Sequence, residues 1–95
     1  PWDSHLVRMS VHPNAPVAGH RLRETELRTR YGLNVVAIRR GSQAIVAPKP
    51  DQQIFPQDEL LFLGTDAQLD SARHLIEEPR QGSSKAHEAS IEGYE

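Results

Sequence analysis

The chain has 95 residues and no cysteine, which excludes disulfide bonds and thiolate metal sites. Its net charge of −2 conceals an asymmetry: residues 1–50 hold eight Lys/Arg and three Asp/Glu (+5), and residues 51–95 hold three and ten (−7). No apolar run approaches the roughly 18–20 residues that span a bilayer. Because the chain starts at Pro1 without a methionine, we expect a fragment of a larger protein.

The first predicted strand covers His5–His12, where apolar and polar residues alternate. Val7, Met9 and Val11 fall on one face of such a strand. The segment 12–16 contains two prolines, which cannot continue a hydrogen-bond ladder. The strand is therefore expected to end there.

A charged helical segment follows between Gly19 and Arg30. Leu22 and Leu27 are its expected buried contacts, and Gly32 is a suitable C-terminal stop. A single helix with a break and two separate helical turns are both compatible with this segment.

A hairpin of two strands is predicted next. Val35–Arg40 forms its first strand, residues 41–43 form the turn, and Ala44–Ala47 forms the short second strand. Pro48 and Pro50 end the hairpin. Strict alternation places the odd-numbered residues of the first strand on one face and the even-numbered residues on the other.

The rest of the chain predicts a loop, a strand and a helix. Ile54 and Phe55 are the expected buried residues of the loop. Glu59–Gly64 is apolar on both faces, which predicts a central strand covered on both sides. Thr65 or Asp66 is expected to cap a final helix from Ala67 to about Glu77, whose apolar stripe is Leu69, Ala72, Leu75 and Ile76.

The order strand, helix, three strands, helix predicts an α+β domain over residues 1–78. We expect a small, mostly antiparallel sheet of about four strands with short helices on one face. Its second apolar face needs cover, and in so short a chain a homodimer would supply that cover. Residues 79–95 are expected to form a disordered polar tail.

No sequence motif of a catalytic or metal site stands out. The chain lacks a nucleophile elbow, a P-loop, a dinucleotide fingerprint and a zincin motif, and its five histidines lack metal-ligand spacing. Asp58 and Glu59 are adjacent, so they point to opposite sides of a strand and do not suit an acid–base pair. The aromatic residues are not interleaved with a basic run, so no DNA or RNA partner is expected. We therefore predict that the chain is not an enzyme and has no metal site.

Residues 4–77 nevertheless carry an ordered set of positions that resembles the RCK C-terminal, or TrkA-C, domain. The matching residues are Gly19, Leu22, Leu27, Gly32, Asn34, Val35, Ile38, Arg40, Gly41, Ile45, Pro48, Pro50, Asp51, Asp58, Leu60, Gly64 and Thr65. Gln57 departs from the pattern, which commonly has Gly at that position. This departure bears on the geometry of the local turn.

The resemblance implies a dimer that binds a small effector between its subunits, with cyclic di-AMP or another nucleotide as the candidate, and no other cofactor. It implies that the amide of Asn34 hydrogen-bonds the edge of a base. The apolar walls for the base would come from Val35, Val46 and Pro48. The guanidinium groups that contact phosphates would come from Arg28, Arg30 or Arg39. Asn34 is equally compatible with a plain turn after Gly32, and the valines are compatible with plain sheet core.

The opening residues 1–7 resemble the segment that leads into this domain in bacterial cation/proton antiporters. The resemblance implies a cytoplasmic domain of an inner-membrane sodium or potassium transport protein, with the membrane-embedded part of that protein as a partner. The gating domain of a potassium channel or uptake system is one alternative. A purely structural dimerisation module without ligand is another.

Overall fold

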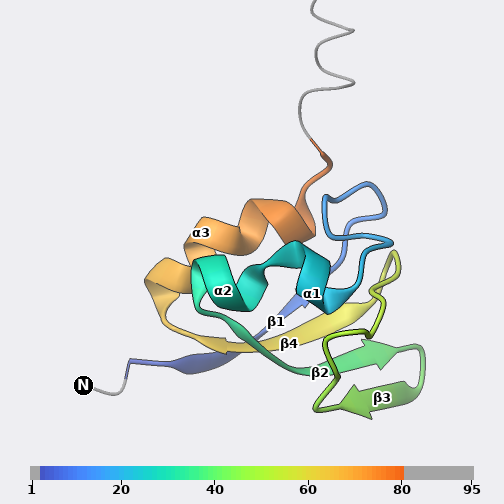
Figure 1. Ribbon diagram of the computed structural model, residues 1–95, viewed down its shortest axis with the longest axis horizontal. Coiled ribbons are helices and arrows are strands. Elements are labelled where there is room, and N and C mark those ends of the chain that lie inside the picture. The colour runs from blue at the N-terminus through green and yellow to red at the C-terminus, as the bar shows by residue number, and fades with distance from the viewer. Residues whose placement is uncertain (1–2, 81–95) are drawn as a thin grey trace, which may run out of the picture.

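The computed structural model describes residues 3–80, which form four strands and three helices. Their bounds are β1 His5–Ser10, α1 Leu22–Thr25, α2 Leu27–Tyr31, β2 Asn34–Arg40, β3 Gln43–Val46, β4 Glu59–Gly64 and α3 Asp66–Glu77. The strands form one antiparallel sheet in the order β1-β4-β2-β3. All three helices lie on the same side of this sheet (Figure 1). The predicted α+β class is confirmed.

The hydrophobic core lies between the sheet and the helices. Met9, Leu60 and Ile38 stand in one row across β1, β4 and β2, and each is at most 1% exposed. α3 covers them with the apolar stripe predicted from its sequence, in which Leu69, Ala72 and Ile76 are buried. The side of the sheet that carries this row is called its inner face below.

The first strand is shorter than its sequence pattern suggests. β1 ends at Ser10 because the next backbone N–H groups take other partners. The N–H of Val11 donates to the carbonyl of Asp58 at 2.8 Å, and that of His12 donates to Ile76 at 2.8 Å. Alternation alone cannot show that the chain has turned toward α3.

The charged segment 19–30 forms two short helices, which decides between the two alternatives left open by the sequence. Glu26 separates α1 from α2 in a left-handed conformation, with φ 58°. Gly32 then ends α2 as predicted, with φ 72°. Its N–H donates to the carbonyl of Arg28 at 3.1 Å, and this turn carries the chain into β2.

A β-bulge in β2 overturns the strict alternation predicted for that strand. Val35 pairs with Phe62 while Ala37 pairs with Leu61, so Val36 is an extra residue in the ladder. A bulge shifts the phase of the side chains by one position. Val35 and Ile38 therefore share the inner face, although their numbers differ in parity.

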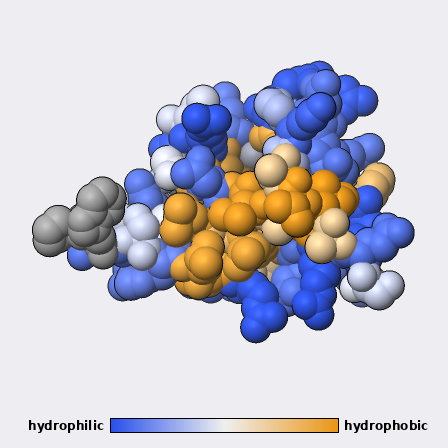
Figure 2. Space-filling model, turned by 90° about the horizontal axis from the view of Figure 1, so that it is seen from below, coloured by the Kyte–Doolittle hydropathy of each residue, from blue (hydrophilic) through white to orange (hydrophobic). Residues whose placement is uncertain are grey.

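The opposite face of the sheet is apolar and open. β4 is central, as predicted, but it is not covered on both sides by the described residues, since Leu63 is 36% exposed. Figure 2 shows the resulting hydrophobic patch across the sheet. We call it the outer sheet face, formed by Leu6, Val36, Ala37, Ala44, Val46, Leu61 and Leu63. The second apolar face expected from the sequence is thus present.

The remaining local predictions have mixed outcomes. Thr65 caps α3, which starts at Asp66, one residue earlier than predicted. Ile54 is buried, but Phe55 is 40% exposed, so its predicted burial is wrong. Gln57, at the position where the family pattern has Gly, adopts the left-handed conformation with φ 70°.

Most of the predicted tail, residues 81–95, lies outside the described residues. Within residues 3–80, no helix combines the length and the apolar character that crossing a membrane requires.

Candidate ligand-binding site

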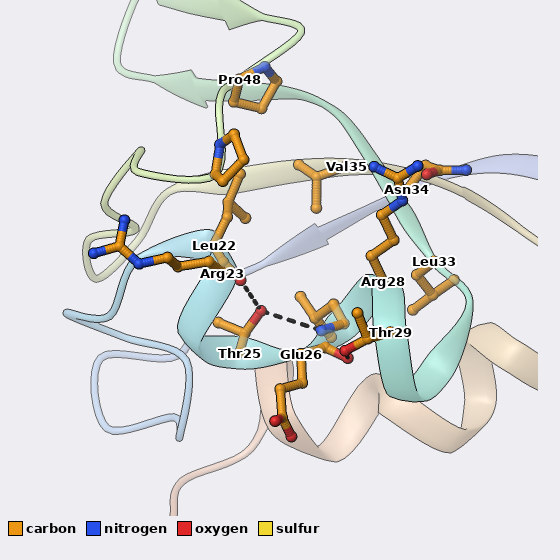
Figure 3. A pocket seen from close by; sticks show the side chains of 12 residues that line it. Leu22, Arg23, Thr25, Glu26, Arg28, Thr29, Leu33, Asn34, Val35 and Pro48 are labelled. Carbon is orange, nitrogen blue, oxygen red and sulfur yellow. Dashed lines mark hydrogen bonds between the residues drawn. The ribbon is translucent and has the colours of Figure 1, made fainter.

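A pocket of about 310 Å³ opens between the two short helices and the start of β2. This volume is at the lower end of the range typical of small-molecule sites. Figure 3 shows its three walls. They are α1 and α2, the start of β2, and the β3–β4 connection (residues 47–58), and the lining residues are Leu22, Arg23, Thr25, Glu26, Leu27, Arg28, Thr29, Leu33, Asn34, Val35, Pro48 and Pro50.

The left-handed residues Glu26 and Gly32 shape the helical wall of the pocket. The first bends the chain between α1 and α2, and the second turns it sharply so that Leu33 N–H donates to the carbonyl of Leu27 at 3.0 Å. Leu33 is buried and Asn34, the next residue, is exposed at the pocket. A tight turn thus places a polar side chain beside an apolar floor.

The opposite wall is attached to α1 through backbone hydrogen bonds. Arg23 N–H donates to the carbonyl of Pro50 at 3.0 Å, and Leu22 N–H donates to Gln52 at 2.9 Å. The side chains of Arg23 and Asp51 form an ion pair across the same junction. Pro48 and Pro50 also restrict the backbone of this wall, so the wall is stiff.

Two polar side chains of the pocket remain available to a ligand. Within residues 3–80, neither the guanidinium of Arg28 nor the amide of Asn34 has a hydrogen-bond or ion-pair partner. The hydroxyl of Thr25, by contrast, donates to the carbonyl of Leu22 at 2.7 Å (Figure 3). A cation and an amide next to apolar walls suit an anionic ligand that carries a heteroaromatic ring.

Four of the seven residues predicted for the site line this pocket: Arg28, Asn34, Val35 and Pro48. The other three do not. Arg30 lies on the other side of the α1–α2 junction, in a separate cavity with His20 and Tyr31, where its guanidinium is 3.6 Å from Glu26.

Arg39 and Val46 belong to the other side of the sheet. Val46 is 72% exposed on the outer sheet face, and the guanidinium of Arg39 lies 3.9 Å from Glu59. The bulge in β2 separates Arg39 from Val35, although strict alternation had put both on one face. Val46 pairs with Ala37, which the same bulge turns outward.

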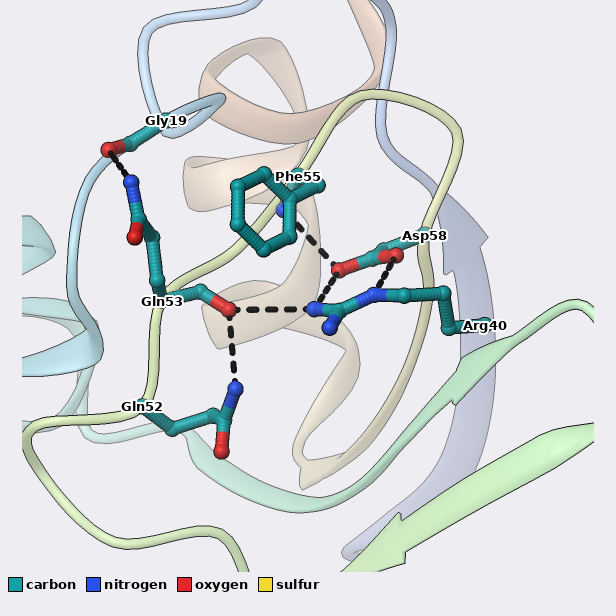
Figure 4. Close-up of polar contacts among 6 residues, drawn as sticks. All are labelled: Gly19, Arg40, Gln52, Gln53, Phe55 and Asp58. Atoms are coloured by element: carbon teal, nitrogen blue, oxygen red, sulfur yellow. Dashed lines mark hydrogen bonds and ion pairs between the residues drawn. The ribbon is translucent and has the colours of Figure 1, made fainter.

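Sequence reasoning missed a polar network behind the β3–β4 connection, shown in Figure 4. The carboxylate of Asp58 accepts two hydrogen bonds from Arg40, at 2.9 and 2.8 Å, and one from the N–H of Phe55 at 2.9 Å. Arg40 also donates to the carbonyl of Gln53 at 3.2 Å and lies 4.5 Å from the ring centroid of Phe55. The hydrogen bonds to the carboxylate of Asp58 raise the pKa of Arg40.

This network fixes the connection that carries Pro48 and Pro50, but it does not line the pocket. Asp58 and Glu59 point to opposite sides, as the sequence predicted, because Asp58 is buried beside Arg40 while Glu59 faces Arg39. Within residues 3–80, no three His, Asp or Glu side chains are grouped closely enough to hold a metal ion.

The pocket and fold can be compared with known proteins. The chain is 38% identical over 57 residues to Ktr system potassium uptake protein C of Bacillus subtilis, an alignment that covers 60% of this chain and 26% of that protein. Among solved structures, the RCK C domain of the potassium transport protein KtrA, in complex with cyclic di-AMP, matches with a TM-score of 0.68 and 27% identity. That match covers 74% of this chain and 80% of the KtrA chain.

A third similarity is to BusR of S. agalactiae and concerns the fold alone. Its RCK_C domain dimer, in complex with c-di-AMP, matches with a TM-score of 0.68 and 20% identity over 77% of this chain and 91% of that chain. BusR in complex with its promoter DNA matches with a TM-score of 0.67 and 21% identity, and this match covers 74% of this chain and 35% of the BusR chain. Because this fold occurs in a DNA-bound protein, the predicted absence of a DNA partner is not supported.

The match to a family of domains covers most of the chain. The model of the TrkA-C domain matches residues 6–77, which run from β1 to the end of α3. This range contains every residue of the pocket. The chain therefore belongs to the TrkA-C domain family.

Proposed function

We propose that this domain is a cytoplasmic regulatory module of a monovalent cation transport protein and that it binds an anionic nucleotide in the pocket. The observation that carries the proposal is the meeting of Arg28 and Asn34, both available, with the apolar residues Val35 and Pro48 in one cavity. Cyclic di-AMP is the first candidate ligand, since the similar KtrA domain was solved with it.

Each group of the pocket has a distinct task in this proposal. The guanidinium of Arg28 pairs with a phosphate, a contact that the planar geometry of arginine strengthens. The amide of Asn34 offers both donors and an acceptor to the edge of a base. Val35 and Pro48 supply apolar walls for the faces of the base.

The size of the pocket favours one half of a cyclic dinucleotide. A volume of about 310 Å³ suits one base and its sugar better than the whole molecule. Cyclic di-AMP has two identical halves, so one molecule can engage two equal pockets on two copies of the domain. The proposal therefore expects one ligand for every two chains.

Potassium transport is the favoured setting, because the 38% identical relative is a potassium uptake protein. A sodium or potassium/proton antiporter is the alternative parent. In either setting the ligand regulates transport only if it binds one arrangement of the assembly more tightly than another, since equal affinity shifts no equilibrium.

Isothermal titration calorimetry of the domain with cyclic di-AMP, AMP and ATP tests the proposal. We expect saturable binding of cyclic di-AMP at one ligand per two chains. Arg28→Gln should weaken this binding, while Arg30→Gln, a matched change on the other side of the α1–α2 junction, should not. A folded protein that releases no heat with any of the three nucleotides would contradict the proposal and leave a structural module.

A further inference from the structure

A second hollow, of about 530 Å³, lies at the C-terminal end of β1. Three segments form its walls: the end of β1 with the residues that follow it, the turn before β4, and the last turn of α3. Its polar lining residues are Arg8, Ser10, His12, Gln57 and Glu77. None of them lines the candidate nucleotide pocket. The volume is within the range typical of small-molecule sites, so the hollow has room for a ligand of its own.

Backbone hydrogen bonds hold the three segments together. Gln57 N–H donates to the carbonyl of Val11 at 2.8 Å, and Val11 N–H donates to the carbonyl of Asp58 at 2.8 Å. These two bonds join the end of β1 to the turn before β4. His12 N–H donates to the carbonyl of Ile76 at 2.8 Å, which joins the same segment to α3. The shape of the hollow is therefore set by main-chain contacts of the fold.

Three polar side chains of the hollow are available to a ligand. Arg8 and Ser10 are two positions apart in β1, so their side chains share one face of the strand. Both are exposed, as is Gln57 in the turn before β4. Within residues 3–80, the side chains of these three residues make no hydrogen bond or ion pair. A guanidinium, a hydroxyl and an amide are thus free to donate.

The ring of His12 adds a donor whose position is fixed. The backbone N–H of Asn14 donates to Nδ1 of His12 at 2.9 Å. Because Nδ1 accepts this bond, the proton of the neutral imidazole lies on Nε2, which can donate to a ligand. Four side-chain donors of different kinds therefore line one hollow.

The carboxylates near the hollow are already paired with arginines. Glu77 accepts a hydrogen bond from Arg73 at 3.1 Å. Glu59, which lies on β4 opposite the end of β1, is 3.9 Å from the guanidinium of Arg39. The charge of Arg8 has no such counterpart among residues 3–80. The local balance of charge therefore favours an anionic ligand.

We propose that this hollow binds a phosphate group. The guanidinium of Arg8 matches the geometry of a phosphate, and hydrogen bonds between charged partners are the strong ones. A phosphate has more acceptor oxygens than a carboxylate, and the hydroxyl of Ser10, Nε2–H of His12 and the amide of Gln57 can donate to them. Inorganic phosphate and the phosphate group of an ester share this chemistry. The inference does not depend on the proposed nucleotide site, so its test uses protein without nucleotide.

An NMR titration of the isotope-labelled domain with inorganic phosphate, in a phosphate-free buffer, is the first experiment. We expect saturable shifts of the backbone amides of Ser10, His12 and Gln57. Arg8→Gln should weaken the binding roughly tenfold, the effect of losing a hydrogen bond to a charged group. Arg30→Gln removes the same charge outside the hollow and should leave the affinity unchanged. Shifts that do not saturate, or an Arg8→Gln variant that binds as the wild type does, would overturn the proposal.

A second variant tests the amide without straining the backbone. Gln57 has a φ of 70°, a conformation that glycine adopts readily, so Gln57→Gly should stay folded. It should bind phosphate several-fold more weakly than the wild type, because one donor is lost. Unchanged affinity in this folded variant would contradict the assigned role of Gln57.

Titrations with glycerol phosphate and acetate identify the ligand class. Tighter binding of glycerol phosphate than of inorganic phosphate would support a phosphate ester as the natural ligand. Equal or weaker binding of glycerol phosphate would support inorganic phosphate. Acetate that binds as tightly as either phosphate compound would overturn the assignment to a phosphate group, because a carboxylate would then satisfy the same donors.

Discussion

Arg40 and Asp58 form a bidentate ion pair between the end of β2 and the end of the β3–β4 connection, with N–O distances of 2.9 and 2.8 Å. Asp58 is only 1% exposed, whereas 36% of the Arg40 side chain is accessible. Arg40 also donates a hydrogen bond to the carbonyl of Gln53. It therefore links the strand that begins at the pocket to the connection that forms the opposite wall.

Removing the guanidinium should destabilise the domain. Arg40→Met leaves the buried carboxylate of Asp58 with the N–H of Phe55 as its described donor. We expect the free energy of unfolding to fall by about 1.5–3 kcal/mol, the range for a lost hydrogen bond to a charged group. Urea unfolding measures the change, and Arg30→Met, at an exposed arginine, should stay within about 0.5 kcal/mol of wild type. Equal effects of the two substitutions would show that the Arg40–Asp58 pair has no special role.

Truncating the pocket amide should weaken nucleotide binding without unfolding the protein. Asn34→Ala removes the proposed base-reading group, and we expect a loss of binding free energy of about 1–3 kcal/mol. Because Asn34 is exposed, thermal unfolding should change little. Isothermal titration calorimetry with cyclic di-AMP measures the affinity of the variant and of the wild type. If the variant binds as the wild type does, Asn34 is only a turn residue.

The left-handed turn at Gln57 predicts a stabilising substitution. A side chain at φ 70° costs roughly 1–2 kcal/mol, which glycine avoids. Glycine also gives the unfolded chain more freedom, which offsets roughly 0.5–1 kcal/mol. We expect Gln57→Gly to raise the free energy of unfolding by about 0.5–1 kcal/mol.

Gln52→Gly is the matched control for that substitution, because Gln52 has no positive φ and its side chain donates to the carbonyl of Gln53 at 3.1 Å. It should lower the free energy of unfolding. A destabilised Gln57→Gly variant would mean that contacts of the Gln57 side chain outweigh the backbone strain.

The cap of α3 should contribute measurably to stability. The Thr65 hydroxyl accepts from the N–H of Gln68 at 3.2 Å, and the Gln68 side chain accepts from the N–H of Thr65 at 2.9 Å. Thr65→Ala should lower the free energy of unfolding by about 0.5–2 kcal/mol, as measured by thermal or urea unfolding.

Ser71→Ala tests whether that loss is specific to the cap. The Ser71 hydroxyl donates to the carbonyl of Ala67 within the helix, at 2.6 Å, a bond that adds little to helix stability. Its removal should therefore be close to neutral. A loss in Ser71→Ala as large as that in Thr65→Ala would refute the capping role.

Much of the fold could be predicted from local patterns. The apolar run of β4, the cap of α3 at Thr65 and the stop at Gly32 each depend on residues that are neighbours in the chain. The second apolar sheet face was also foreseeable, because β2 and β4 carry apolar residues on both sides while the chain is too short to cover both. Asn34 and Val35 both line the pocket, since the turn at Gly32 brings the start of β2 to its edge.

Other features depend on contacts between distant residues. Arg40 and Asp58 are 18 positions apart, and no periodicity indicates that their side chains meet. The bulge at Val36 reverses the sides expected for part of β2, and the register of β2 against β4 decides where it falls. Because of this bulge, Arg39 and Val46 lie on the other side of the sheet from the pocket and do not line it.

The amino-acid sequence by itself determined the order of the elements and the class of the fold, because these follow from short-range patterns of polarity, turns and caps. The family was indicated by the resemblance of an ordered set of residues, and the match of the TrkA-C domain model shows it. Only the tertiary structure decided which side chains share a pocket. A β-bulge, or a left-handed residue such as Glu26, changes the direction in which the side chains after it point. Where a bulge or such a turn forms depends on how the segment packs against strands and loops that are distant in the sequence.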